Sequence, residues 1–287
     1  MNMKAKGLIL LYISGASSLG AISCTVPTSH VIQKLHSTHT ECVDSVTNQV
    51  ITYPKCSNTS EPGEICSIAF ADIRPTQFTY GDSYVLDIKQ RFIGKPAKAQ
   101  EFLCEKPPSL VIGPKKAEGF YLTDGHHRMK LVEKLMKEES NIFTILVQVD
   151  KNIYLSNPNM EQAAFWDEML KNNDVYLKDK GIFRSPKELP KRIFEVKNDP
   201  FRSLAGFIAD DKSKFCFDTS LPSYGNFAEF YWGDYFREIK GFEHYTDEKN
   251  YQSVKERIQN YRLPGSDKIV NICKVSAAEK LPGYIKD

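Results

Sequence analysis

Tyr121-Leu-Thr-Asp-Gly-His-His-Arg128 is the stretch from which the fold can be predicted. Its apolar start and the preceding Leu110-Val-Ile-Gly-Pro114 predict two short strands, because glycine and proline bound them. After Arg128, apolar residues recur at helical spacing through Met136, with charged residues between them. Residues 124–128 therefore lie where a strand is followed by a helix, as expected in an α+β fold.

The chemistry of this turn indicates an anion site. Asp124 is a candidate N-cap, and Gly125 lets the backbone approach a ligand closely. The free N–H groups and the positive dipole end of a helix start attract phosphate. Two imidazoles and a guanidinium can bind phosphate and move protons. We therefore predict Asp124, His126 and His127 as catalytic, with Gly125 and Arg128 holding phosphate.

A structural role for the same residues stays open. Adjacent histidines near a helix start also occur as surface residues or as hydrogen-bonding partners of the fold. One of the pair is expected to be structural, because neighbouring side chains on a helix diverge by about 100°. The divergence also argues against both histidines chelating one metal ion. In a purely structural interpretation, Arg128 would be an ordinary ion-paired residue of the helix.

The N-terminus has the pattern of a secretory signal peptide over residues 1–23. Two lysines precede the uncharged apolar run Gly7–Ile22, which ends at small residues. Cleavage is expected before Cys24, so the protein is predicted to be exported to a periplasm or secreted. A lipid anchor on Cys24 ranks second, because Ala21 stands where leucine is usual, and a short membrane anchor is a further alternative. The mature chain has no other stretch of transmembrane length.

The net charge of the chain limits the kinds of ligand that it can attract. The chain has 38 Lys and Arg against 36 Asp and Glu, and removal of Lys4 and Lys6 with the leader leaves 36 against 36. A neutral protein has no global field that attracts a long polyanion. A nucleotide or a short stretch of nucleic acid is therefore the expected ligand.

An exported protein can form disulfides, and six cysteines follow Cys24. Residues 24–66 are polar and predicted to be an extended lead-in with at least one bridge, but the pairing stays open. A zinc site at His36, His39 and Cys42 is less favoured, because its spacing matches no closed zinc site. The cysteines are Cys42, Cys56, Cys66, Cys104, Cys216 and Cys273.

The order of predicted elements gives a compact α+β domain over residues 67–150, followed by a mainly helical region over 151–287 that packs on it. Residues 182–190 are expected to form a loop. The expected strands cover 67–77, 110–114, 120–123 and 141–149, and the expected helices cover 84–92, 95–103, 129–136, 160–170, a segment from 199 onward and 227–237.

Several residues outside the turn are candidates for supporting roles. Asp72 and Arg74 would project toward the site, where Arg74 would bind phosphate, or they would pair with each other. Arg202 would reach a phosphate or form a buried ion pair with an acid. Glu229 and Asp234 would face His126 as a base or metal ligand, or would lie on a helix whose aromatic residues only pack.

Six blocks in the right order resemble the ParB-like nuclease family, within the ParB/sulfiredoxin superfamily. The resemblance implies a small mixed sheet with helices and a phosphate cradle at residues 124–128, and it adds Gln77 as a supporting residue. The blocks are Ala71–Gln77, Leu110–Pro114, Tyr121–Arg128, Phe165–Trp166, Asp199–Gly206 and Phe227–Arg237.

The resemblance does not decide the reaction. Members of the superfamily bind CTP, reduce sulfinylated cysteine, phosphorylate free serine or cut DNA. Chromosome-partitioning members have Gly-Glu-Arg-Arg at this turn, whereas Gly125-His-His-Arg128 is nearer to the sulfiredoxin and serine-kinase forms. Sulfiredoxin chemistry needs a cysteine there, and none is present. No helix-turn-helix follows the turn, which argues against partition-site binding.

Three functions therefore remain open. The first is phosphodiester hydrolysis, with Mg²⁺ or Mn²⁺ as a divalent cofactor on Asp124, Asp72 or Glu229. The second is a nucleotide-dependent small-molecule kinase, against which export counts because ATP is scarce outside the cytoplasm. The third is a non-catalytic nucleotide- or phosphate-binding module. Hydrolysis ranks first.

Overall fold

The structure is a computed structural model that describes residues 40–43, 49–139, 143, 145–242 and 248–285. Residues 37–287 belong to one compact unit. The predicted leader, the lipid anchor on Cys24 and the histidines of the alternative zinc site lie outside the described residues. Among the described helices, none combines the length and apolar character needed to span a bilayer.

A five-stranded mixed sheet forms the centre of the fold, in the order β3-β8-β6-β7-β4. β8 runs antiparallel to β3 and parallel to β6, while β7 runs antiparallel to β6 and parallel to β4. This sheet confirms the predicted α+β class. The strands are β3 (Ile65–Ile68), β4 (Ile73–Pro75), β6 (Ser109–Ile112), β7 (Phe120–Leu122) and β8 (Ile145–Asn152).

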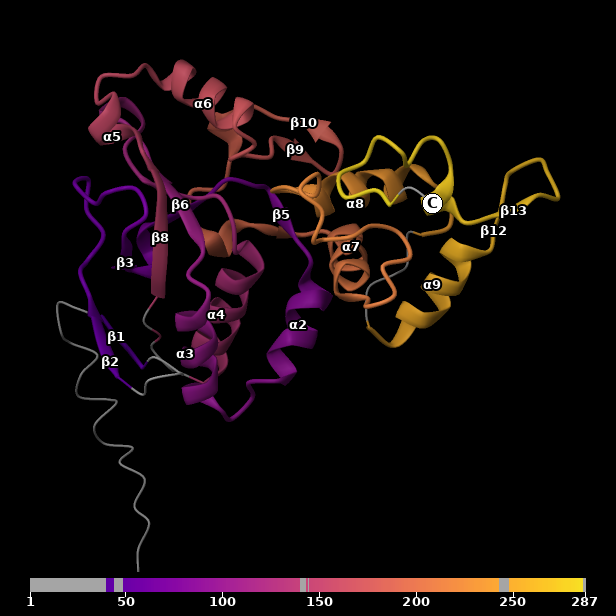
Figure 1. Cartoon of the computed structure of the whole chain (residues 1–287), viewed down its shortest axis with the longest axis horizontal. Helices are drawn as coiled ribbons and strands as arrows, with labels where there is room; N and C mark the ends of the chain where they lie inside the picture. Colours follow the sequence, from indigo (N-terminus) through magenta and orange to yellow (C-terminus); the bar gives the residue numbers. More distant parts are fainter. Residues whose placement is uncertain (1–39, 44–48, 140–142, 144, 243–247, 286–287) are drawn as a thin grey trace, which may run out of the picture. The chain divides into compact units, whose positions relative to one another are not determined.

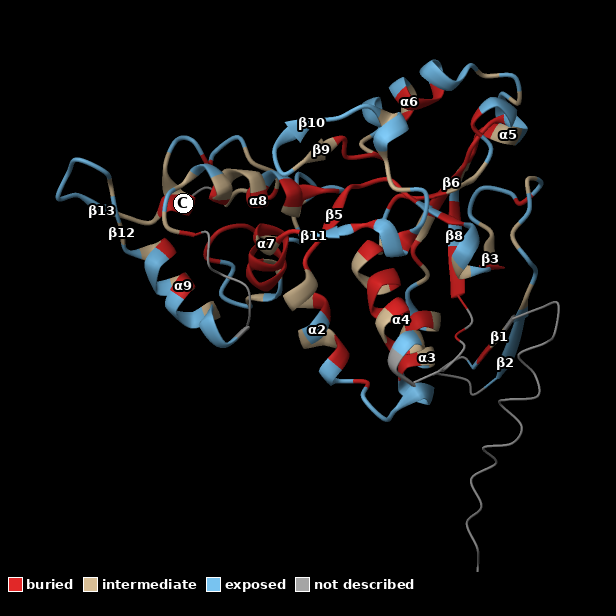
Figure 2. Cartoon of the chain, turned by 180° about the vertical axis from the view of Figure 1, so that it is seen from behind, coloured by how far each residue is buried: buried red, intermediate tan, exposed pale blue. Residues whose placement is uncertain are grey.

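Helices cover both faces of the sheet (Figure 1). Leu110 and Ile112 join the core that packs under α2, α3 and α4, whereas Val111 joins the core under α6. This alternation follows from the two-residue period of a strand, and the interior of both layers is buried (Figure 2). The helices are α2 (Asp82–Gln90), α3 (Pro96–Glu105), α4 (His126–Glu139), α5 (Ile153–Ser156) and α6 (Gln162–Lys171).

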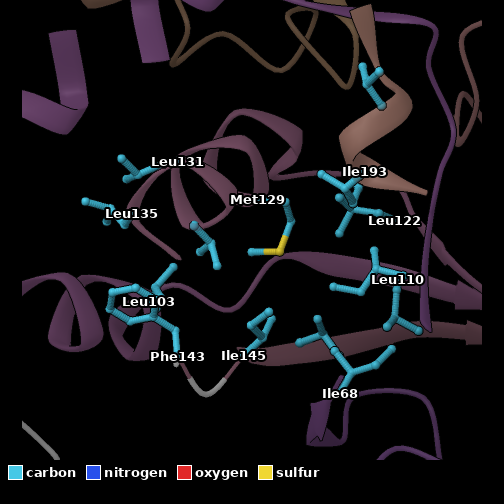
Figure 3. Packing of buried hydrophobic residues seen from close by; sticks show 14 of the residues in the cluster. Ile68, Leu103, Leu110, Leu122, Met129, Leu131, Leu135, Phe143, Ile145 and Ile193 are labelled. Carbon is cyan, nitrogen blue, oxygen red and sulfur yellow. The ribbon is translucent and has the colours of Figure 1, made fainter. Parts of the chain in front are cut away.

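The larger core lies between α4 and the sheet (Figure 3). Met129 of α4 extends toward Leu110, Leu122 and Ile145 of the strands, and these four side chains are at most 2% exposed. The apolar periodicity after Arg128 thus forms the inner face of a helix, as predicted. This packing fixes the start of α4, and with it the turn, against the carboxyl end of β7.

The C-terminal region is mainly helical and has its own aromatic core around Trp232, Phe236 and Phe217. It joins the sheet domain where α7 packs on α2 and where β11 pairs with β5. Its main elements are α7 (Pro200–Asp210), α8 (Ala228–Glu238) and α9 (Tyr251–Gln259), with the short strands β5 (Thr79–Tyr80), β9 (Lys178–Asp179), β10 (Ile182–Phe183), β11 (Lys197–Asn198), β12 (Tyr261–Arg262) and β13 (Ile269–Val270).

Three local predictions differ from the structure. The strand expected over 67–77 is interrupted at η2 (Phe70–Asp72), because β3 and β4 form opposite edges of the sheet and the chain must cross between them. The loop expected over 182–190 begins with strand β10, which pairs with β9 in a hairpin. α4 begins at His126, before the first apolar residue of the periodic run.

Three disulfides are present among the described residues, as expected from the even number of cysteines. Cys56–Cys66 lies within the polar lead-in, where at least one bridge was predicted with its pairing open. Cys42–Cys104 joins α3 to the hairpin of β1 (Thr40–Val43) and β2 (Val50–Tyr53). Cys216–Cys273 lies buried in the C-terminal core. Cys42–Cys104 and Cys216–Cys273 each close a long loop, with sequence separations of 62 and 57 residues.

Substitution of Leu110 tests the central position of β6. Leu110 is fully buried, so Leu110→Ala should lower the free energy of unfolding by about 2–5 kcal/mol, measured by urea denaturation. Val50→Ala is the control, because that side chain is 56% exposed and should change stability by about 0.5 kcal/mol or less. Equal losses in both variants would contradict the described core.

Candidate functional site

The turn between β7 and α4 depends on Gly125. Its carbonyl accepts the first helical hydrogen bond, from the Met129 N–H at 2.9 Å, so Gly125 holds the N-cap position that was predicted for Asp124. The backbone there has φ +80°, and a Cβ atom on Gly125 would lie 2.5 Å from Cβ of Pro108. Only glycine fits both constraints. The Asp124 side chain is exposed and makes no hydrogen bond with the described residues.

Both histidines are fixed by backbone amides. The N–H of Thr76 donates to Nε2 of His126 at 3.1 Å, and the N–H of Gly81 donates to Nε2 of His127 at 3.1 Å. An imidazole that accepts at Nε2 and is neutral carries its proton on Nδ1. Both rings therefore present Nδ1–H as a donor, and neither has a free nitrogen lone pair.

Burial keeps both imidazoles neutral. It lowers the pKa of His126 well below the ordinary 6.5, and the neighbouring His127 and Arg202 add to this effect. It also lowers the pKa of His127 to about 4, although the carboxylate of Glu229 opposes the shift. A histidine with an ordinary pKa would gain a proton near neutral pH, whereas this pair does not.

A cavity of about 400 Å³ opens beside these rings. Its floor is the turn and the start of α4, and its walls come from α2, α3, α7 and the segment 224–230. The lining residues are Gln77, Tyr84, Ile88, Phe102, Thr123, Asp124, Gly125, His126, His127, Arg128, Leu131, Arg202, Tyr224, Gly225, Asn226, Phe227, Ala228, Glu229 and Phe230.

Arg128 is the cation best placed for a ligand. Its guanidinium carbon lies 4.8 Å from the ring centroid of Phe102, and within the described residues no carboxylate comes within 4 Å of it. The backbone N–H groups of His126, His127 and Arg128 likewise make no hydrogen bond inside that part of the chain, as expected at a helix start. Together they form a cationic cradle for an anion.

Glu229 and Arg202 form a buried ion pair on the opposite wall. Nη2 of Arg202 lies 2.8 Å from Oε2 of Glu229, and Tyr224 donates its hydroxyl to Oε1 at 3.3 Å. The same Oε2 is 3.9 Å from Nδ1 of His127. Burial alone would raise the pKa of Glu229, but the charge of Arg202 and the hydrogen bonds from Arg202 and Tyr224 outweigh it and hold the carboxylate ionised.

Arg202 has hydrogen-bonding capacity left over. It is only 4% exposed, and its guanidinium carbon lies 3.7 Å from the ring centroid of Phe230. Its Nε and Nη1 atoms are buried without a hydrogen-bond partner among the described residues. A buried cation with unused donors beside a cavity is suited to an anionic ligand.

The structure brings together most of the residues that the sequence indicated. Three lie elsewhere. Asp72 is exposed in η2, Arg74 lies over the ring of Tyr121 at 5.8 Å, and Asp234 binds Tyr176 and Arg237. The predicted residues that line the cavity are Gln77, Asp124, Gly125, His126, His127, Arg128, Arg202 and Glu229.

Sequence reasoning missed two parts of the site. Thr76 and Gly81 contribute only backbone N–H groups, which leave no signal in residue type. The aromatic walls were also missed, because aromatic residues that line a cavity have the same sequence pattern as aromatic residues of an ordinary hydrophobic core. One backbone feature marks this wall: Phe227 has φ +59°, a conformation that bulky residues rarely adopt outside constrained sites. The wall residues are Tyr84, Phe102, Tyr224, Phe227 and Phe230.

Metal-binding capacity is limited to isolated carboxylates. Across the described ranges, no group of three or more His, Cys, Asp or Glu side chains is placed to hold a metal ion. Asp124 and Glu229 are the carboxylates among the residues that line the cavity.

Comparisons with known proteins agree with this arrangement. The sequence model of a family described as "Putative ParB-like nuclease" matches residues 66–238, which include the turn and both sides of the cavity. The fold is similar to that in the crystal structure of protein Atu1540 from Agrobacterium tumefaciens, with 24% identity and a TM-score of 0.55, over 77% of this chain and 97% of that one. No curated protein matches the chain.

A substitution at Gly125 tests the turn. Gly125→Ala should lower the free energy of unfolding by about 2 kcal/mol or more, since it combines an unfavourable positive φ with the contact to Pro108. Gly63→Ala is the matched control, because Gly63 has φ +88° and no atom lies within 4 Å of the place that its Cβ would take. If thermal and urea denaturation gave the same loss for both, the close approach to Pro108 would be refuted.

The buried histidines make stability depend on pH. Between about pH 6.5 and 4 the unfolded chain protonates His127 while the folded chain does not, so stability falls as the pH falls through this window. His127→Gln keeps an acceptor for the Gly81 N–H but removes the titration. The wild type should therefore lose more stability than the variant, by up to about 1.4 kcal/mol per pH unit inside this window. Urea midpoints at pH 7, 6 and 5 check this, and parallel curves would contradict it.

Proposed function

The chain belongs to the ParB-like nuclease family, and from this membership and the site we propose that it hydrolyses a phosphodiester bond in a nucleotide or a short nucleic acid. The substrate phosphate would bind at the turn from Asp124 to Arg128. The cavity volume of about 400 Å³ suits a ligand of nucleotide size.

Four kinds of donor would hold the phosphate. The N–H groups at the start of α4 and the guanidinium of Arg128 face the cavity without protein acceptors among the described residues. The Nδ1–H groups of the two neutral histidines add donors that do not change with pH near neutrality. The unused Nε and Nη1 atoms of Arg202 supply further charge, which would stabilise the transition state.

Glu229 is the observation that favours hydrolysis over simple binding. A carboxylate repels phosphate, so a site that only binds phosphate gains nothing from an ionised Glu229 on its wall. A hydrolase needs such a group to orient the attacking water and accept its proton. In this mechanism the water oxygen attacks phosphorus, Glu229 takes the proton, and the bond to the leaving oxygen breaks. The leaving oxygen takes a proton from solvent.

For the histidines, the hydrogen bonds at Nε2 support a role different from the general acid or base expected from sequence. Their Nε2 atoms are already used by the backbone, so protonation there would break a buried hydrogen bond. We propose that His126 and His127 position the phosphate through Nδ1–H.

A divalent cation fits the residues that are present. Mg²⁺ and Mn²⁺ are commonly held by one or two carboxylates together with substrate phosphate and water. Asp124, whose side chain makes no hydrogen bond with the described residues, would be the protein ligand, and the ion would neutralise charge on the transferring phosphoryl group.

Export is the second part of the proposal. Disulfides persist in oxidising compartments and are rare in the cytosol. The three bridges of the described chain support a periplasmic or secreted protein. A hydrolase needs no ATP, so its chemistry suits such a compartment better than phosphoryl transfer from a nucleotide does.

A non-catalytic phosphate- or nucleotide-binding module is the second candidate. One observation favours it: both histidines have fixed structural hydrogen bonds and neither can act as a base at Nε2. Under this alternative, Glu229 would serve only to neutralise the buried Arg202.

A turnover assay tests the proposal. Its substrates are bis(p-nitrophenyl) phosphate, short DNA and short RNA, each with Mg²⁺, Mn²⁺ or EDTA. Glu229→Gln should lower kcat about 100-fold or more while ligand affinity stays within a few-fold, because a general base contributes about 10²–10⁴. Arg128→Ala should instead weaken ligand binding. His126→Gln and His127→Gln should leave the pH profile of kcat between pH 6 and 8 unchanged.

Asp234→Asn is the matched control, because Asp234 lies on the same helix as Glu229 but outside the cavity lining. Equal activity of wild type and Glu229→Gln would exclude the hydrolytic mechanism. Binding of nucleotide without turnover of any substrate would establish the module instead.

A further inference from the structure

Two of the three disulfides lie next to opposite walls of the cavity. Cys104 is two residues from Phe102 in α3, and Phe102 both lines the cavity and contacts Arg128. Cys216 precedes Phe217, whose ring stacks on the cavity residue Tyr224 at 5.6 Å. Neither bridge touches the turn itself, so they affect the site only through its walls.

Apart from the bridge, a short apolar face holds the α3 wall on the core. α3 has 10 residues, of which Ala99 and Leu103 are buried. Helices of this length are marginal without tertiary contacts. Its neighbour along the bridge is the β1–β2 hairpin, on which Val43 and Val50 are both 56% exposed, and a two-stranded hairpin is marginal too. Cys42–Cys104 joins two weakly held elements into one wall (Figure 1).

The wall opposite depends on the second bridge. Residues 211–227 contain no helix or regular strand, yet they carry Tyr224 and Phe227 into the cavity lining. Cys216–Cys273, a hydrogen bond from the Asp218 N–H to the Gly283 carbonyl at 2.9 Å, and the burial of Phe217 in the C-terminal core are among the contacts that hold them.

The same C-terminal segment also anchors α8, which carries Glu229. Trp232 donates its indole N–H to the Pro282 carbonyl at 2.8 Å, and Tyr235 donates its hydroxyl to the Ile272 carbonyl at 2.6 Å. Ile272 is the residue before Cys273. The bridge therefore ties the loop with Tyr224 and the helix with Glu229 to one common support.

We propose that Cys42–Cys104 and Cys216–Cys273 form a redox lock on the site, so that the cavity is assembled only after both bridges have formed. The consequence for activity rests on the proposed hydrolytic function: the chain would be inactive in the reducing compartment where it is made and active after export. Cells would thus be protected from a phosphodiesterase during its synthesis.

Bridge formation needs an oxidant, which we name as a disulfide donor such as oxidised glutathione or a disulfide oxidoreductase. One cysteine thiolate attacks the donor disulfide and releases one donor thiol, giving a mixed disulfide. The partner cysteine then attacks this mixed disulfide and releases the second donor thiol. Two protein thiols are oxidised, and one donor disulfide is reduced to two thiols.

Three paired substitutions test the lock. Cys42→Ala with Cys104→Ala and Cys216→Ala with Cys273→Ala each remove one wall bridge. Cys56→Ala with Cys66→Ala is the matched control, because that bridge closes a separation of 10 residues and neither cysteine lines the cavity. Each wall pair should lower turnover of bis(p-nitrophenyl) phosphate about tenfold or more, as expected when catalytic groups are misplaced by about 1 Å. The control pair should stay within about threefold of wild type, well short of that loss.

Hydrogen exchange on the same proteins separates a loosened wall from a failure to fold. Residues 97–105 should exchange faster in the first pair and residues 211–230 in the second, while β8 stays protected in both. Fully reduced wild type should be inactive and should regain turnover when oxidised glutathione is added. Full turnover in either wall pair, or an equal loss in the control pair, would overturn the proposal.

The outcome also separates the lock from the function on which it rests. If oxidised wild type hydrolyses no substrate, the proposed function fails and exchange alone decides the lock. If hydrogen exchange were faster only in the two walls, the redox lock would still hold, and the bridges would then assemble a binding site. Unchanged exchange would refute it.

Discussion

Two backbone hydrogen bonds hold this site together. The Thr76 and Gly81 N–H groups, which lie between β4 and the start of α2, donate to the two histidines at the start of α4. The bond from Thr76 joins residues 50 positions apart in sequence, and the bond from Gly81 joins residues 46 positions apart. They also determine the tautomer of each ring, and hence which atom faces a ligand. Burial of both rings makes these bonds hard to break, since an unpaired buried amide is costly.

The pocket is strongly polar although the formal net charge of the chain is only +2. The cations of the site are few and local: Arg128 at the turn and Arg202 on the facing wall. Glu229 neutralises Arg202 in part, and the histidines contribute dipoles without charge. Such a site attracts a phosphate at short range, but it exerts little force on a polyanion in solution.

The turn and its helix could be predicted because their signals are local. A glycine, a change of hydrophobic period and a basic cluster all occur within residues 121–136. Glu229 and Arg202 were found because they lie in family blocks, but their pairing required the fold. Arg74 was misleading for a physical reason: in β4 it alternates with the core residue Ile73, so it lies on the face of the sheet away from the cavity. Sheet order, disulfide pairing and backbone donors depend on long-range contacts that no local pattern encodes.

The edge positions of β3 and β4 also have a consequence for how the chain folds. In the sheet, β3 pairs only with β8, so one edge cannot form until the chain beyond residue 145 is available. Cys42 and Cys104 both precede that point, so their bridge can close before the sheet is complete. Early closure of this loop lowers the conformational-entropy cost of the strand pairing that follows between distant parts of the chain. The oxidant that meets the emerging chain can therefore influence the rate at which the sheet assembles, as well as the stability of the finished protein.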